Sequence, residues 1–176
     1  YVNVVYDTNT NKVVVFWMDY GNSQYGTAAV GTVTGTALSW GTASVFNSAE
    51  TTFIAATFDS DANKTVTAYR DGGASNYGKA IVGTVDGAAN TISFGTEADF
   101  NAASTTNIGM GFDSTANKAV IAFRDDGNSD HGTAVVGTVS GTGISFGSET
   151  AFQTNQTSSH NLAHDPDENK MILVYK

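Results

Sequence analysis

The sequence predicts an all-β fold, a β-propeller of four-stranded antiparallel units with three full repeats and a two-stranded half repeat. A D-x-x-x-N-K motif that begins at Asp7, Asp59, Asp113 and Asp165 recurs at spacings of 52, 54 and 52 residues. A fixed period of this length, with strands inside it, is typical of propellers and repeat arrays. Segments rich in Val, Ile, Thr and aromatic residues alternate with Gly, Asn, Asp and Ser turns, as short strands require. No segment carries an apolar stripe at helical spacing.

We therefore expect one repeat domain over residues 1–176, with repeats at about 1–52, 53–106 and 107–158 and a half repeat at 159–176. Three and a half units should not close a propeller, which typically has 4–8 of them. The sequence leaves two explanations open. Either the chain is part of a longer propeller, or oligomerisation completes the ring.

The first two strands of each repeat differ in composition. The first strands are expected at Val2–Tyr6, Phe53–Phe58, Asn107–Phe112 and Ser159–His164, and they carry small residues. The second strands are expected at Val13–Asp19, Thr65–Asp71, Ala119–Asp125 and Met171–Tyr175, and they are apolar on both faces. Strands of the second kind must be covered on both sides.

The third and fourth strands complete each unit. The third strands are expected at Thr27–Val33, Lys79–Val85 and Thr133–Val139, and the fourth at Leu38–Phe46, Ile92–Phe100 and Ile144–Phe152. Aromatic residues recur at two positions of the fourth strands: Trp40, Phe94 and Phe146, and Phe46, Phe100 and Phe152. We interpret these rings as core between adjacent units.

The strand order resembles the unit of WD-repeat and sialidase-like β-propellers over nearly the whole chain. The sialidase Asp-box, S-x-D-x-G-x-T-W, is echoed by Asp125-Asp126-Gly127-Asn128-Ser129, whereas the Trp-Asp dipeptide of WD repeats is absent. The repeats also resemble those of surface and tail proteins of marine bacteria and their phages. These resemblances imply an exposed module, adhesin-like or lectin-like.

Composition narrows the class of partner. The formal net charge is −9, and the eight Lys and Arg residues are too few for nucleic-acid binding. The longest apolar run, Val13–Met18, is too short for membrane insertion. An acidic, Cys-free chain rich in Thr, Gly and Asn fits an extracellular or virion-surface location.

The D-x-x-x-N-K turns resemble the opening of calcium loops, and Asp59, Asp61 and Asn63 are weak candidates for calcium ligands. An EF-hand loop has Gly at its sixth position, but Lys64 stands there. Asx-turns, in which Asp and Asn bond to their own backbone, explain the motif better. We expect no metal and no cofactor.

Catalysis is not expected. Asp19, Asp71 and Asp125 recur at one position of every repeat, which indicates a structural role. Sialidases use three arginines, and this chain has only Arg70 and Arg124. A glycosidase-like enzyme is the weakest alternative.

The predicted function is therefore a non-catalytic propeller module that binds a glycan or protein receptor through one loop face. An alternative is a structural or assembly module of a larger fibre or shell. The loops also fit a repeated structural element without any ligand. The candidate ligand-binding residues lie in or beside the loops between second and third strands: Trp17, Asp19, Tyr20, Tyr25, Arg70, Asp71, Tyr77, Arg124, Asp125 and His131.

Overall fold

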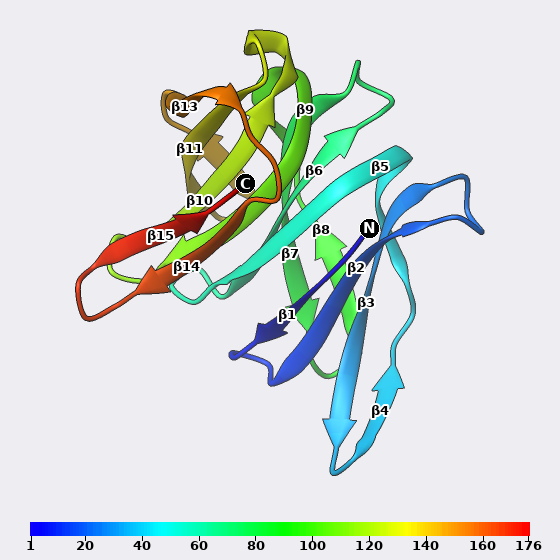
Figure 1. Cartoon of the computed structure of the whole chain (residues 1–176). Helices are drawn as coiled ribbons and strands as arrows, with labels where there is room; N and C mark the ends of the chain where they lie inside the picture. The colour runs from blue at the N-terminus through cyan, green and yellow to red at the C-terminus, as the bar shows by residue number, and fades with distance from the viewer.

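The computed structural model describes all 176 residues and confirms the all-β class (Figure 1). The only helix is a short 3-10 turn at Asp126–Asn128, so no helix of the chain is long and apolar enough to cross a membrane. The strands are β1 (Val2–Asp7), β2 (Lys12–Asp19), β3 (Tyr25–Thr34), β4 (Ala37–Trp40), β5 (Ser44–Asp59), β6 (Lys64–Asp71), β7 (Tyr77–Asp86), β8 (Thr91–Phe94), β9 (Ala98–Asp113), β10 (Lys118–Asp125), β11 (His131–Ser140), β12 (Gly143–Phe146), β13 (Thr150–Gln156), β14 (Asn161–Asp165) and β15 (Lys170–Val174).

The predicted β-propeller is wrong. Backbone pairing links 13 strands into one antiparallel sheet that stays open at both ends, and β14 and β15 form a separate hairpin. The reason lies in β5 and β9, which are 16 residues long and continue from one repeat into the next. Repeats joined by shared strands form a continuous sheet that folds back on itself in sandwich-like layers, rather than separate units closed around an axis.

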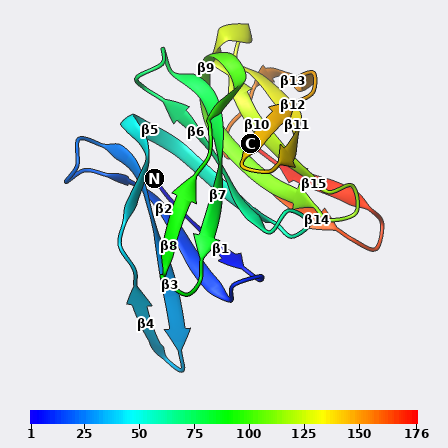
Figure 2. The ribbon, with the colours of Figure 1, turned by 180° about the vertical axis from the view of Figure 1, so that it is seen from behind.

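Four segments of this sheet are useful for describing the molecule. Unit 1 comprises β1 to β4 and the first half of β5. Unit 2 comprises the second half of β5, β6 to β8 and the first half of β9. Unit 3 comprises the rest of β9 and β10 to β13, and the C-terminal hairpin is β14 and β15. Seen from behind, the units lie next to one another with their faces in contact (Figure 2).

Two apolar layers hold the units together. The layer between units 1 and 2 contains Val14, Phe16, Phe46 and Tyr69, and the layer between units 2 and 3 contains Phe100, Phe123 and their neighbours. Phe46 contacts Tyr69 with ring centroids 5.2 Å apart, and Phe100 contacts Phe123 at 5.1 Å. Core between units is therefore present at Phe46, Phe94, Phe100 and Phe146, as the repeated aromatics predict. The prediction is wrong for Trp40, which is 49% exposed because no unit covers the outer face of unit 1.

Each predicted fourth strand is split in two, which is a second correction. β4 ends at Trp40 and β5 begins at Ser44, with Gly41 in the gap. A side chain at Gly41 would lie 1.8 Å from the carbonyl oxygen of Asn90, so only glycine lets the turn of unit 2 approach this closely. Gly95 meets Thr142 of unit 3 in the same way.

The D-x-x-x-N-K turns are closed by their own side chains. Oδ1 of Asp59 accepts hydrogen bonds from the backbone N–H groups of Asp61 and Ala62, at 3.0 and 2.8 Å. Asn63 adopts a φ of 54°, a left-handed conformation that Asn tolerates. No group of three or more His, Cys, Asp or Glu side chains in the chain is arranged to hold a metal ion.

Candidate functional site

The unit junctions are the places where β5 and β9 pass from one unit to the next. The pairing of β5 with β6 shifts register between Thr52 and Ala55, and Phe53 in this bulge has a φ of 51°. β9 has the same irregularity, with Asn107 at a φ of 51°. Bulges re-aim side chains, and a bulky residue such as Phe is strained at positive φ.

The junction of units 1 and 2 combines two rings and a guanidinium. The ring of Phe53 lies 4.8 Å from that of Tyr1, and the guanidinium carbon of Arg70 lies 5.0 Å from the Phe53 centroid. Nε of Arg70 donates to Oγ1 of Thr52 at 2.8 Å. These contacts fix the guanidinium over the ring as a cation–π pair.

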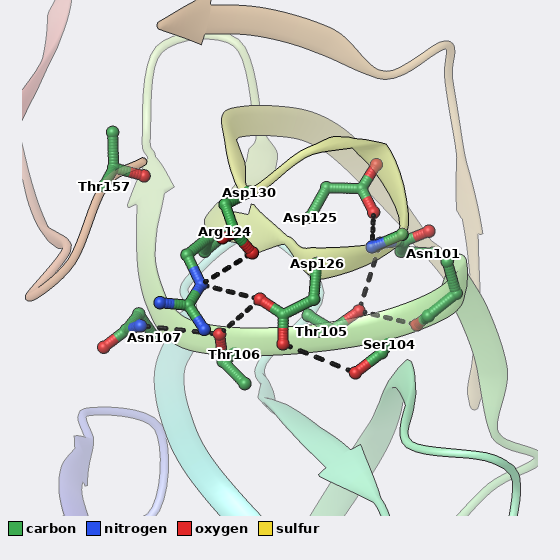
Figure 3. Close-up of polar contacts among 12 residues, drawn as sticks. Asn101, Ser104, Thr105, Thr106, Asn107, Arg124, Asp125, Asp126, Asp130 and Thr157 are labelled. Atoms are coloured by element: carbon green, nitrogen blue, oxygen red, sulfur yellow. Dashed lines mark hydrogen bonds and ion pairs between the residues drawn. The ribbon is translucent and has the colours of Figure 1, made fainter. Parts of the chain in front are cut away.

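The junction of units 2 and 3 places carboxylates at the equivalent point (Figure 3). Nε of Arg124 donates to Oδ1 of Asp126 at 2.6 Å and lies 3.6 Å from Oδ1 of Asp130. Thr106 also donates to Asp126, at 2.8 Å. The hydrogen bond that Arg124 donates to Asp126 raises the pKa of Arg124, which partial burial alone would lower. The guanidinium is therefore a fixed positive charge held by its Nε.

The junction of unit 3 with the C-terminal hairpin contains a histidine. Ring nitrogens of His160 lie within hydrogen-bond distance of the carbonyl oxygen of Asn107 and, at 3.0 Å, of Oγ1 of Thr157. Burial lowers the pKa of His160; the bond to Asn107 opposes this effect and the charge of Arg124 adds to it. The net effect favours the neutral imidazole.

The predicted loop aspartates mainly close their own loops. Oδ1 of Asp19 accepts the backbone N–H of Gly21, and the equivalent oxygens of Asp71 and Asp125 accept those of Gly73 and Gly127. In each unit the Asp is paired across the strands with the predicted loop aromatic, which is Tyr25, Tyr77 or His131. The pairs belong to three separate loops, and Tyr20 stands exposed in the first of them.

Trp17 lies apart from the other predicted residues. It lines an open apolar groove on the outer face of unit 1 together with Val2, Val15 and Trp40. The equivalent residues of units 2 and 3, Tyr69 and Phe123, are fully buried against the preceding unit. The groove therefore has the composition of a packing face, and we assign no ligand to it.

A charged cluster in unit 2 was missed by the sequence analysis. Nζ of Lys79 lies 2.6 Å from Glu97, 3.2 Å from Asp99 and 3.9 Å from Asp71, and the hydroxyl of Tyr69 donates to Glu97 at 2.9 Å. Burial alone would raise the pKa of Glu97, but the bonds from Lys79 and Tyr69 outweigh it and lower this pKa. Because the charges satisfy one another, this cluster is structural.

Unit 3 lacks the cation of that cluster. Thr133 replaces the lysine and Phe123 the tyrosine, and Glu149 stands at the equivalent position to Glu97. Partial burial raises the pKa of Glu149, with a smaller contribution from the charge of Asp125. Neither surface pocket of the chain includes these carboxylates, so no recess places a substrate beside them.

Comparisons with known proteins give a likeness of fold. No family model matches the chain, and no curated protein matches it. Among solved structures, an exo-β-1,3-galactanase from Phanerochaete chrysosporium, determined with β-1,3-galactotriose, is similar with a TM-score of 0.52 and 8% identity. The likeness covers 99% of this chain but only 44% of the galactanase chain. At this identity it shows the fold alone.

The functional prediction is corrected by these findings. The predicted receptor-binding module depended on a propeller with one loop face, but the sheet is open and its loop residues remain in separate loops. Of the predicted ligand-binding residues, Arg70 and Arg124 lie at the unit junctions, whereas Tyr1, Phe53, Thr106 and Asp126 were missed.

Proposed function

We propose that the chain binds carbohydrate along the unit junctions. The observation that carries this proposal is that equivalent points of two adjacent units hold a guanidinium by its Nε, beside aromatic rings in one case and carboxylates in the other. The fold likeness to a galactanase supports the ligand class.

The two junctions offer complementary chemistry for a sugar. The ring of Tyr1 is exposed and that of Phe53 is partly buried, and both provide apolar planes for the C–H faces of a pyranose. The outer nitrogens of Arg70 and Arg124 are donors for hydroxyl groups, and Asp130, whose side chain is 40% exposed, is an acceptor.

Repetition of the junction favours a polymer over a single sugar. Equivalent positions of a repeat lie at regular intervals, so a ligand with its own repeat can occupy more than one junction at once. Linked binding events of this kind raise the overall affinity without any new type of contact. An oligosaccharide should therefore bind more tightly than the monosaccharide from which it is built.

The proposal does not include catalysis. The carboxylate of Asp126 is engaged by Arg124, Thr106 and Ser104, and that of Asp125 by a backbone N–H group. A glycosidase needs one carboxyl group free to donate a proton and a second free to act as base or nucleophile. An extracellular or virion-surface location belongs to the same proposal, since exposed polysaccharides are found there; the acidic, Cys-free composition supports it.

The test is binding to a panel of oligosaccharides that includes β-1,3-galactotriose, followed by titration calorimetry on two variants. Phe53→Asn introduces the residue of the equivalent position 107, so the left-handed backbone is preserved while the ring is lost. It should weaken binding by about threefold to tenfold, the worth of one aromatic contact. Arg124→Met introduces the residue of the equivalent position 18 and should weaken binding by about tenfold to a hundredfold.

Tyr6→Ser is the matched control, because it removes an exposed aromatic residue at the other end of β1 from Tyr1. It should leave affinity unchanged. The proposal fails if no oligosaccharide binds, or if binding survives in both junction variants while the control abolishes it.

A further inference from the structure

Units 1 to 3 show what normally lies beside a second strand. β2, β6 and β10 each pair with two neighbours, a first strand on one side and a third strand on the other. β15 occupies the place of a second strand but pairs with β14 alone. The backbone groups along its other edge are therefore available for pairing.

The face of unit 3 beside this edge is uncovered in the same place. Val136 is 46% exposed, whereas Val30 and Val82 at the equivalent positions of units 1 and 2 are completely buried. Tyr175 of the hairpin packs on Phe152 of this face, whereas Ile172 and Val174 point to the opposite side of β15 and are not part of it. This surface is apolar, as the covered surfaces of units 1 and 2 are.

A glycine at the end of each fourth-strand segment also shows that unit 3 has no following unit packed against it. Side chains at Gly41 or Gly95 would collide with a turn of the following unit, at 1.8 Å in both cases. At Gly147, the equivalent position of unit 3, the nearest atom is 3.8 Å away. The glycine is therefore present in all three units, but only in unit 3 does no turn of a following unit pack against it.

The aromatic contacts agree. Phe46 packs against Phe94 of the next unit at 5.7 Å, and Phe100 packs against Phe146 at 6.0 Å. Phe152 contacts only His160 and Tyr175, which belong to the first and second strand positions of the hairpin. A fourth-strand aromatic partner is missing.

We propose that this surface, formed by the β15 edge, Val136, Gly147 and Phe152, docks a β-hairpin with the sequence of the repeat's own third and fourth strands. Those strands share the pattern G-x-A-x-V-G-T-V, a turn, and then S-[WF]-G. The first segment adds a strand to β15 by backbone pairing, which is β-augmentation. The carbonyl oxygen of the hairpin's turn packs against Gly147, and the aromatic residue of its S-[WF]-G segment packs against Phe152.

The experiment adds a fluorescently labelled peptide with the sequence of residues 77–95, which covers β7, its turn and β8, to the full chain. Fluorescence anisotropy should show saturable binding. Hydrogen exchange should show that amides of β15 become protected, while those of β1 at the other end of the sheet do not. The same peptide with Ala80→Pro and Val82→Pro cannot donate to a ladder and should not bind.

Gly147→Val tests whether the turn of the docked hairpin packs against this glycine. In the free chain a Cβ there would meet only the carbonyl oxygen of Val136, at an ordinary contact distance of 3.8 Å, and φ is not positive, so the variant should unfold at the temperature of the parent. A side chain at position 147 would collide with the docked turn and should weaken peptide binding by about tenfold or more, as expected for overpacking a close contact. Ser93→Val, an exposed position in the middle unit, is the control and should bind normally.

Three results would overturn the proposal. One is no anisotropy change at about 100 μM peptide, a concentration that would saturate a complex with a Kd of about 1 μM. Another is equal binding by the proline peptide or by the Gly147→Val chain. The third is that β15 is already protected in a concentration-dependent oligomer of the chain alone, because a second copy would then be the occupant.

Discussion

Replacing Phe46 by Ala is expected to lower the free energy of unfolding by about 3–5 kcal/mol, the cost of deleting a buried Phe side chain. Phe46 is 7% exposed, and its ring lies 6.1 Å from Phe16, 5.2 Å from Tyr69 and 5.7 Å from Phe94. Each aromatic pair contributes roughly 0.5–1.5 kcal/mol beyond area burial. Losing three pairs and leaving a cavity places the effect in the upper half of the range.

The equivalent residues provide an internal comparison. Phe100 is 3% exposed and contacts Phe123 and Phe146, so the same substitution should cost about as much as at Phe46. Phe152 is only partly buried and its partners are His160 and Tyr175, so its replacement should cost about half as much, roughly 1.5–2.5 kcal/mol.

Urea denaturation followed by circular dichroism measures all three losses, provided that the slope of free energy against urea stays constant among the variants. The ordering matters more than the absolute values, because it compares one side chain in three equivalent places. Equal losses at Phe46, Phe100 and Phe152 would refute the conclusion that the last face of the sheet is open. A small loss at Phe46 would refute the layered packing of units.

Three further predictions concern single sites. Gly41→Ala should destabilise the fold by about 1–3 kcal/mol because Asn90 must move, whereas Gly147→Ala should change stability by less than about 0.5 kcal/mol in a parallel urea titration. Burial is the largest cause of the lowered pKa of His160, so stability should be constant above the unfolded value of 6.5 and should fall as the pH drops below it; His160→Gln should flatten this step in a pH series of melting temperatures. Lys79→Met should cost about 1–2 kcal/mol at low salt and less at high salt, since two of the three carboxylates around it, Glu97 and Asp99, are partly exposed, and scanning calorimetry at two ionic strengths measures the difference.

Most strands could be predicted because hydrophobic alternation and turn residues act locally. The continuity of β5 could not. Asn47 and Thr51 read as a polar connection, but both are buried: Nδ2 of Asn47 donates to Oγ1 of Thr51 at 3.0 Å, and Thr51 donates to the carbonyl oxygen of Ala49 at 2.9 Å. Polar side chains that satisfy one another inside a strand resemble a loop in sequence. That mutual satisfaction keeps neighbouring units in one sheet.

The site could be predicted in part for a similar reason. Arg70 and Arg124 stand out because the chain has only two arginines. Phe53 does not stand out, because its place in a bulge depends on how β5 shifts register against β6. Asn107 at the equivalent position could have indicated a left-handed backbone at this point of the repeat, since Asn is enriched at positive φ. Trp17 lies apart from the other candidates because the outer face of unit 1 has no neighbour, which the sequence does not show.

The chemistry of the junction position follows from what the backbone requires there and what it leaves free. Phe53, Asn107 and Ser159 have φ values of 51°, 51° and 56°, so the fold demands a left-handed residue but not a particular side chain. Asn or Gly satisfies that demand at least cost, and Phe satisfies it poorly. The backbone therefore gives no reason for a ring at position 53, and the contacts that the ring makes are the remaining reason. Since these include Tyr1 and Arg70 on a partly exposed surface, the junction of units 1 and 2 is where a ligand would gain most from the departure from the repeat.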